Sequence, residues 1–210
     1  MSRTAVRLTL DHLDALPGSC QECVFWECDA VRRQRVDEPA LEKQAWVSEV
    51  LREWGSCGRV ALVDGEAVGY AIYAPAGLVP GAAGFPTAPV SSDAVLLTTA
   101  WVAPVERGGG VGRMLVRAVA RDLVDRDVRA LEAFGHTGRG AARCTVPAEF
   151  LSRVGFRTHR AHPVTPRMRM DLRTAISWRS EVEAALEKLV GAVRPQTAPR
   201  RAPEGTPRSE

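Results

Sequence analysis

Lysine and long apolar runs are what this chain of 210 residues has least of. Lys occurs only at Lys43 and Lys188, so arginine supplies all the rest of the 28 Lys and Arg residues, a bias typical of GC-rich genomes. No apolar run approaches the roughly 18 residues of a membrane-spanning helix, and residues 1–10 lack the charged-then-apolar layout of a signal peptide. The formal net charge of only +3 indicates no strong attraction to nucleic acids or membranes. We therefore expect a cytoplasmic protein with neither kind of partner.

Cysteine is also scarce and occurs an odd number of times, five, which does not suggest a disulfide framework. Thiols in the cytoplasm stay reduced. The hydrophobic content of 45% is ordinary for a globular protein. A chain of this length can bury one sizeable core and carry additional segments.

The stretch VERGGGVGRMLVRAVARDLV (Val105–Val124) is rich in glycine and then turns helical. It lacks the Lys of a P-loop, and Arg113 or Leu115 stands where a dinucleotide fingerprint needs its third glycine. What remains is Arg107-x-x-Gly110-x-Gly112 at the start of a helix. The unpaired N–H groups and positive dipole end of a helix bind anions, and glycines let the backbone approach closely. The predicted anion-binding residues are Arg107, Gly108, Gly109, Gly110, Val111, Gly112 and Arg113; the alternative is a glycine loop without a ligand.

The pattern of apolar residues and turn signals predicts the element order β–α–α–β–β–β–α–β–α–β–β. The predicted strands are Ala5–Leu10, two strands within Arg59–Ala74 around the Asp64-Gly65 turn, Ala94–Pro104, Val128–Phe134, Phe156–Ala161 and Arg167–Arg173. Four helices are predicted. The first begins at Cys20, after a capping box of Ser19 and Glu22, and the second covers Pro39–Gly55. The third follows the glycine loop, and the fourth covers Pro147–Val154. Residues 1–175 are expected to form the α/β domain, with an appended amphipathic helix within 176–193 (Ser177–Val193) and a disordered, Pro-rich tail at 194–210.

The loop Arg107–Gly112 after a strand, followed by FLSRVGF (Phe150–Phe156), resembles two motifs of the GNAT acyltransferase superfamily, and the resemblance covers roughly Ala5–Leu172. CVFWE, SSDAVLLTTAWVAP and ISWRSEVEAALEKL are similar, more closely, to a GNAT subgroup of high-GC bacteria. The resemblance implies a central mixed sheet flanked by helices and splayed beside its central strand, with acyl-CoA in the cleft and acetyl-CoA as the acyl donor. It also implies that the pantetheine arm pairs with Ala100–Val102 and the pyrophosphate with Gly108–Arg113. Trp101 and Val102 then join the cofactor-binding set, although Trp101 could equally be a buried strand aromatic.

The catalytic acid is the weakest part of the resemblance. Many GNAT enzymes have a Tyr four residues before the Gly of the Gly-Phe step, where this chain has Leu151. The catalytic candidates are therefore His136, since histidine is the residue type that ordinarily serves as a base near neutral pH, Glu132, which alternates away from Leu131 and Ala133 and is expected to face the cleft, and Asp93 at the mouth of the central strand. A solvated loop histidine and a salt-bridged glutamate are the alternative interpretations.

Four of the five cysteines allow three interpretations. Cys20, Cys23, Cys28 and Cys57 could form a four-thiolate zinc site, although Cys57 lacks a close partner in sequence. Cys20 at a predicted helix start could be redox-active, since a helix dipole favours a thiolate. Burial as small apolar residues is the leading interpretation, and no metal is assigned.

We expect an acyl-CoA-dependent N-acyltransferase acting on an amine of a small molecule or protein. Its acceptor site would be shaped by the first two helices and the Pro75–Asp93 loop. The alternative is a module that binds acyl-CoA without turnover and engages a protein partner through its C-terminal helix, which could also support a homodimer. Contact of the Arg-rich tail with nucleic acid is a weaker alternative, because the tail lacks interleaved aromatics.

Overall fold

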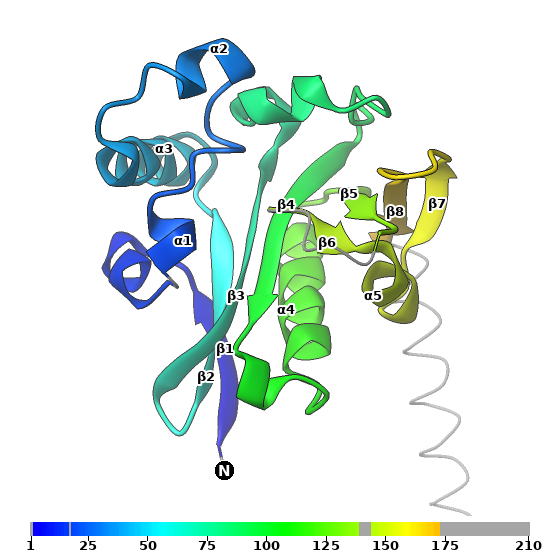
Figure 1. Cartoon of the computed structure of the whole chain (residues 1–210). Coiled ribbons are helices and arrows are strands. Elements are labelled where there is room, and N and C mark those ends of the chain that lie inside the picture. The colour runs from blue at the N-terminus through cyan, green and yellow to red at the C-terminus, as the bar shows by residue number, and fades with distance from the viewer. Residues whose placement is uncertain (1, 17, 139–143, 173–210) are drawn as a thin grey trace, which may run out of the picture. The chain divides into compact units, whose positions relative to one another are not determined.

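A mixed β-sheet is the centre of the part of the chain that the computed structural model describes, residues 2–16, 18–138 and 144–172 (Figure 1). Its strands are β1 (Arg3–Arg7), β2 (Gly58–Val63), β3 (Glu66–Pro75), β4 (Ala94–Val102), β5 (Ala130–His136), β6 (Val146–Pro147), β7 (Arg157–Arg160) and β8 (Arg167–Asp171). They lie in the order β1-β2-β3-β4-β5-β8-β7, with β6 beside β5. All neighbours are antiparallel except β5, which runs parallel to β4 and to β6. The predicted mixed α/β fold is confirmed.

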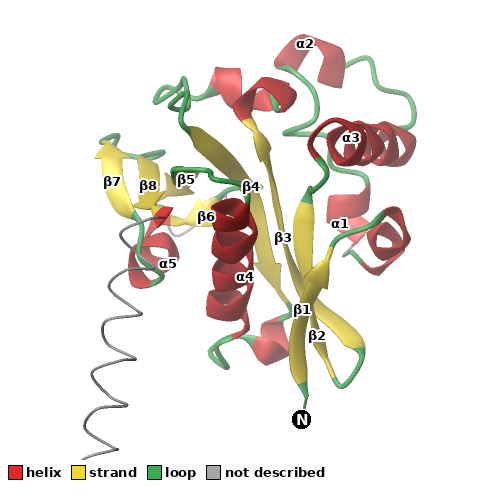
Figure 2. Cartoon of the chain, turned by 180° about the vertical axis from the view of Figure 1, so that it is seen from behind, coloured by secondary structure: helices red, strands yellow, loops and turns green. Residues whose placement is uncertain are grey.

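Helices cover both faces of this sheet (Figure 2). The α-helices are α1 (Gly18–Gln21), α2 (Ala30–Arg33), α3 (Pro39–Trp54), α4 (Val111–Asp125) and α5 (Ala148–Arg153), and short 3-10 helices cover Leu10–Ala15, Ala76–Leu78, Pro80–Gly84 and Pro104–Glu106. Alternation along the strands divides the core: Tyr70 and Ile72 of β3 belong to the cluster with α3, whereas Ala71 and Tyr73 belong to the cluster with α4. One face of the sheet therefore packs against α4 and the other against α3.

Local signals placed several elements correctly. Asp64 and Gly65, with φ of 49° and 93°, form the predicted tight turn between β2 and β3. Pro39 is the first residue of α3, and Gly55, with φ of 78°, ends it. Leu41 of this helix is 56% exposed although it is apolar. Lys43 of the same helix is buried, because its ammonium group pairs with the buried Glu27 carboxylate.

The prediction of a helix beginning at Cys20 is wrong. Helix α1 ends at Gln21, whose side-chain amide donates to the carbonyl of Leu16 at 2.9 Å. The chain then runs irregularly until Asp29, whose carboxylate caps α2 by accepting from the N–H groups of Val31 and Arg32. Tertiary contacts of the intervening residues outweigh their helical pattern, because Trp26 enters an aromatic cluster and Glu27 a buried ion pair.

Asp122 fastens α4 to the sheet. It is only 4% exposed, and its carboxylate accepts from the Tyr73 hydroxyl at 2.8 Å and from the guanidinium groups of Arg59 and Arg126. Burial raises the pKa of this carboxyl, but the Tyr73 hydrogen bond and the Arg59 charge outweigh burial, so the pKa lies below its ordinary value. The C-terminal end of α4 is therefore held against β2 and β3.

The boundary expected at residue 175, the predicted helix Ser177–Val193 and the tail 194–210 lie outside the described residues. The proposed dimer contact through that helix lies there as well.

Candidate functional site

The glycine-rich loop ends at the N-terminus of α4. Gly108 and Gly110 have φ of 82° and 89°, in the left-handed region that favours glycine. The first hydrogen bond of the helix runs from the N–H of Met114 to the carbonyl of Gly110, at 3.0 Å. The N–H groups of Val111, Gly112 and Arg113 come before that bond, so they have no acceptor within the helix.

The surroundings of this loop fit an anion. Residues 107–110 and Arg113 are exposed. A methyl group built on Gly108 or Gly110 would meet no atom within 4 Å. The positive end of the α4 dipole and the two flanking arginines favour a negatively charged ligand at this point. The start of α4 therefore offers donors to an anion, and binding of a cofactor by Arg107–Arg113 stays a prediction.

Two arginines hold the loop in shape. Arg3 of β1 donates to the Gly109 carbonyl at 2.5 Å and lies 3.8 Å from the Glu106 carboxylate. Arg107 donates through Nε to the carbonyl of Val102, at 2.9 Å. The loop is thus tied to both β1 and the end of β4, and Arg107 itself is exposed.

Strands β4 and β5 pair only where they begin. Their paired residues are Ala94–Ala130, Val95–Leu131 and Leu96–Glu132. β8 pairs with the other edge of β5 from Ala130 to Phe134, and β6 pairs with β5 at Gly135 and His136. From Leu97 to Val102, β4 has no strand partner on the β5 side among the described residues. The expected divergence beside the central strand is confirmed. The free edge includes Ala100–Val102, the segment predicted to pair with the pantetheine arm.

A β-bulge interrupts β4 within the same segment, in its pairing with β3. Its pairing with β3 shifts register between Ile72–Thr99 and Tyr73–Leu97, leaving Thr98 as the extra residue. The Thr98 hydroxyl donates to the Ile72 carbonyl at 3.0 Å. Bulges bend a strand and re-aim its side chains, and they are frequent beside active sites.

The second motif, Phe150–Phe156, forms α5 and the turn into β7. A methyl group on Gly112 would lie 3.0 Å from the Phe150 ring and 3.8 Å from a Val102 methyl, so α5 packs directly against the start of α4. Gly155 has φ of 110° and makes the turn after the helix. Leu151, at the position where the family has Tyr, is fully buried.

The opposite face of the sheet carries aromatic side chains. Trp101 of β4 is half-buried and stacks on Tyr70 with ring centres 5.8 Å apart. Phe85 of the Pro75–Asp93 loop stacks on both Phe134 of β5, at 4.2 Å, and Trp26, at 5.2 Å. The loop and the residues around Trp26 therefore cover this face, and the loop is one of the segments predicted to shape the acceptor site. Trp101 packs on Tyr70 but is not fully buried, and its contact with the cofactor stays a prediction.

The chain's two tyrosines have different surroundings. The Tyr73 hydroxyl is engaged by Asp122 and Ser56 on the α4 face. The Tyr70 hydroxyl is buried on the aromatic face, beside Cys20, with no well-aligned hydrogen bond to any described residue. Burial raises the pKa of Tyr70, so its hydroxyl stays protonated at neutral pH.

His136 is the last residue of β5 and is half-buried. Its Nδ1 lies 3.1 Å from the Thr145 hydroxyl oxygen. The two-residue alternation of β5 places it on the same face as Phe134, which is the aromatic face. Of the three predicted catalytic residues, His136 differs from Glu132 and Asp93 in that its ring contacts a hydroxyl group, and its role as a base stays a prediction.

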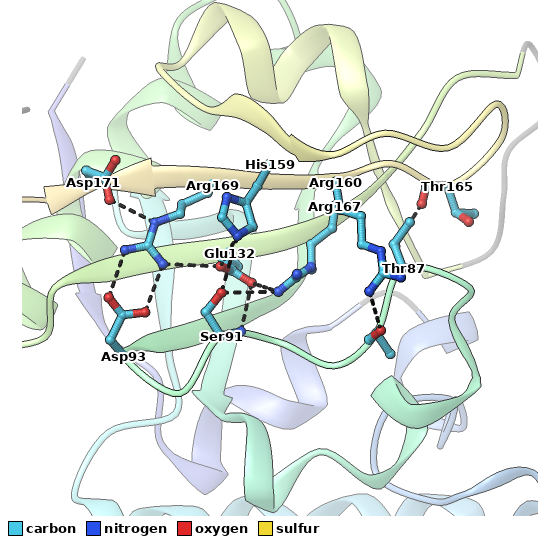
Figure 3. A network of polar contacts seen from close by, with 11 residues as sticks. Thr87, Ser91, Asp93, Glu132, His159, Arg160, Thr165, Arg167, Arg169 and Asp171 are labelled. Atoms are coloured by element: carbon cyan, nitrogen blue, oxygen red, sulfur yellow. Dashed lines mark hydrogen bonds and ion pairs between the residues drawn. The ribbon is translucent and has the colours of Figure 1, made fainter.

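Glu132 and Asp93 belong to a network of ion pairs, shown in Figure 3, and the expectation that Glu132 faces the cleft is corrected. Glu132 does alternate away from Leu131 and Ala133, but its side chain is 0% exposed. Its carboxylate accepts from Arg167 at 2.6 Å and from Arg169 at 3.2 Å, because β8 is paired with β5 in a register that places Arg169 opposite Glu132. Both carboxylate oxygens of Asp93 accept from Arg169, at 2.9 Å.

This network makes both carboxylates poor proton acceptors. Burial raises the pKa of Glu132, but hydrogen bonds from Ser91 and the Arg167 charge outweigh it and lower the pKa below its ordinary value. The Arg169 guanidinium lowers the pKa of Asp93. A general base works best with a pKa near the working pH, so the two residues fit a structural role that fastens the segment before β4 to β8.

The cysteines do not form the zinc site considered from the sequence. Among the described residues, no group of three or more His, Cys, Asp or Glu side chains could hold a metal ion. Cys57 is fully buried in the core with α3, and Cys28 lies 3.7 Å from a carboxylate oxygen of Glu42. The thiol that Cys23 meets is that of Cys144, at 2.9 Å, a neighbour the C-x-x-C spacing did not suggest.

No helix in the described part of the chain is long and apolar enough to cross a membrane. The profile of the Acetyltransferase (GNAT) family matches residues 21–144, and no curated protein matches the sequence.

Several solved structures have a similar fold. The PaiA N-acetyltransferase of Thermoplasma acidophilum, in complex with coenzyme A, is 12% identical; the match covers 81% of this chain and 99% of that one, with a TM-score of 0.55. An N-acetyltransferase from Staphylococcus aureus Mu50 is 15% identical over 82% and 99% of the two chains, with a TM-score of 0.55. The Salmonella typhimurium protein YncA, with its cofactor acetyl-CoA, is 15% identical over 82% and 95%, with a TM-score of 0.56. These identities show a shared fold, and with the family profile spanning more than half of the sequence, the chain belongs to the GNAT acetyltransferase family.

Proposed function

We propose that this protein is an acyl-CoA-dependent N-acyltransferase that uses acetyl-CoA and transfers the acyl group to an amine of a small molecule or a protein. The observation that carries the proposal is the junction of a strand edge without a strand partner among the described residues and the unpaired N–H groups at the start of α4. The free edge of β4, Leu97–Val102, leads directly into the loop whose N–H groups open α4. Coenzyme A is a ligand that presents amides and a pyrophosphate in the same order.

The chain's own groups suit the two ends of this ligand. The N–H groups of Val111, Gly112 and Arg113 would donate to the pyrophosphate, with the Arg107 and Arg113 side chains adding charge. The free backbone edge at Ala100–Val102 would pair with the pantetheine amides as an added strand does. Such pairing holds the thioester in one place, which is the proximity contribution to catalysis.

The transfer step requires a neutral amine and a departing thiolate. His136, on the aromatic face beyond the end of the β4–β5 pairing, is the proposed base that takes the proton of the incoming amine. The amine nitrogen then bonds to the thioester carbon, the carbon–sulfur bond breaks, and the nitrogen gives its remaining excess proton to water. A thiol has a pKa of about 8.5, so the departing thiolate takes its proton from water, without the tyrosine that Leu151 replaces.

The alternative function is an acyl-CoA-binding module without turnover. The specific observation that favours it is the fully buried Leu151 at the position of the family's tyrosine. Binding alone needs the β4 edge and the glycine loop, and both are present.

The test is calorimetric titration of the full chain with acetyl-CoA, followed by measurement of thiol release against a mixed panel of small amines and peptides with free N-termini. We expect saturable binding, and thiol release that depends on one amine class. Binding without release for any amine supports the module. Absence of binding contradicts both functions and leaves the glycine loop as a structural turn.

A further inference from the structure

Two thiols that are far apart in the sequence meet beside the aromatic face. The sulfur atoms of Cys23 and Cys144 are 2.9 Å apart, although 121 positions separate the residues. Cys23 lies between α1 and α2, and Cys144 lies just before β6. Both side chains are half-buried and both are free thiols.

The backbone on both sides of this contact is held by other bonds. The indole N–H of Trp26 donates to the Cys144 carbonyl at 2.8 Å, which joins the two segments independently of the sulfur atoms. Trp26 is itself stacked on Phe85. The thiols therefore stay close together because of their surroundings.

We propose that Cys23 and Cys144 are an oxidisable pair that forms a reversible intramolecular disulfide. A disulfide needs its sulfur atoms about 2.05 Å apart, so the bond requires a movement of less than about 1 Å. Nothing in the GNAT reaction requires these thiols, so the site is additional to acyl transfer and does not rest on it.

The surroundings also select which thiol reacts first. Hydrogen bonding from Cys144, together with the Phe25 N–H and the Lys43 charge, lowers the pKa of Cys23 to about 6 despite partial burial. A thiolate is the reactive form in disulfide exchange. Burial raises the pKa of Cys57 to about 12 and also raises the pKa of Cys28, so these two thiols are poor competitors.

The chemistry balances with a low-molecular-weight disulfide as the oxidant. The Cys23 thiolate attacks one sulfur of that disulfide, which forms a mixed disulfide and releases the first small thiolate. The Cys144 sulfur then attacks the sulfur of Cys23, its proton passing to solvent, and the second small thiolate leaves. Two protein thiols are oxidised to one disulfide, and the small disulfide is reduced to two thiols.

The consequence is a covalent bond between the two segments that border the aromatic face. One segment holds Trp26, and the other continues into Thr145, which contacts His136. Oxidation therefore fixes the chain on either side of this face.

The experiment uses the full, reduced chain and oxidised glutathione as the probe. After incubation, free thiols are alkylated, and trypsin peptides are analysed by mass spectrometry without reduction. We expect one joined pair, Leu8–Arg32 with Cys144–Arg153, lighter than the sum of its parts by two hydrogen atoms. The Cys57 peptide is expected to appear alkylated and unjoined.

Four variants identify the sulfur atoms, because Leu8–Arg32 contains three cysteines. Cys23→Ser and Cys144→Ser should each abolish the joined pair, while the matched controls Cys20→Ser and Cys28→Ser should retain it. Circular dichroism verifies the fold of each variant, and either Cys23→Ser or Cys144→Ser suffices if the other fails to fold. A joined pair that survives Cys23→Ser, a bond to Cys20, a disulfide between two chains, or complete alkylation of all five thiols overturns the proposal.

Discussion

Replacing Gly110 by alanine should weaken acetyl-CoA binding far more than it weakens the fold. Gly110 has φ of 89° and precedes the three unpaired N–H groups of α4. The added methyl group itself has free space, since no atom lies within 4 Å of its position. The substitution therefore acts through the backbone, which an alanine pulls away from the left-handed region at a cost of about 1–2 kcal/mol.

The chain contains a matched control for this strain. Gly65, in the turn between β2 and β3, has φ of 93° and likewise no atom within 4 Å of a methyl group. Gly65→Ala should lose about the same 1–2 kcal/mol of stability. It should leave acetyl-CoA affinity unchanged, because Gly65 lies in the β2–β3 turn and not in the β4–α4 loop.

The expected loss of affinity follows from the hydrogen bonds involved. A hydrogen bond to a charged group contributes about 1.5–3 kcal/mol, so misdirecting one N–H of the loop should raise the Kd for acetyl-CoA about 10- to 150-fold. Calorimetric titration gives the Kd, and urea denaturation gives the stability of each variant. Gly110→Ala and Gly65→Ala should lose about the same stability. If Gly110→Ala nevertheless binds acetyl-CoA as tightly as the native chain does, the assignment of the loop as the pyrophosphate-binding site is refuted.

Three further predictions concern single side chains. His136→Ala should abolish amine-dependent thiol release and leave the calorimetric Kd for acetyl-CoA unchanged. The control His12→Ala, which alters a histidine near β1, should change neither quantity. Normal turnover of His136→Ala would show that His136 is not the base. Asp122→Ala should lower the free energy of unfolding by about 3–5 kcal/mol in urea denaturation, because it leaves the buried Arg59 charge uncompensated; a loss below about 1 kcal/mol would mean that water replaces the carboxylate. Glu132 and Asp122 both have lowered pKa values, so their contribution to stability is full above the unfolded pKa values of about 4 and is lost as pH falls through the folded values. Denaturation from pH 7 to pH 2 should therefore show stability falling below about pH 4, with a shallower fall in Glu132→Gln.

Much of the fold could be predicted because its signals are local. A left-handed turn needs residues such as Asp64 and Gly65, and a helix that begins with Pro39 and ends at Gly55 shows both ends in its own sequence. The glycines before α4 also act locally, since Gly108 and Gly110 adopt the positive φ that glycine favours. The divergence of β4 and β5 was expected only through the family resemblance, and the helix expected at Cys20 failed because its residues are used in contacts that no local pattern reveals.

Tertiary structure alone decided which polar groups meet. The sequence shows that Glu132 alternates away from Leu131 and Ala133. Its partners Arg167 and Arg169, however, depend on the register of β8. Asp122 joins Arg59 and Tyr73 across three elements, and Cys23 meets Cys144 across 121 positions. Local sequence determines backbone conformation because steric and hydrogen-bonding preferences act between neighbours along the chain. The partner of a buried charge or thiol is determined by how whole elements pack, and that information is distributed over the entire core.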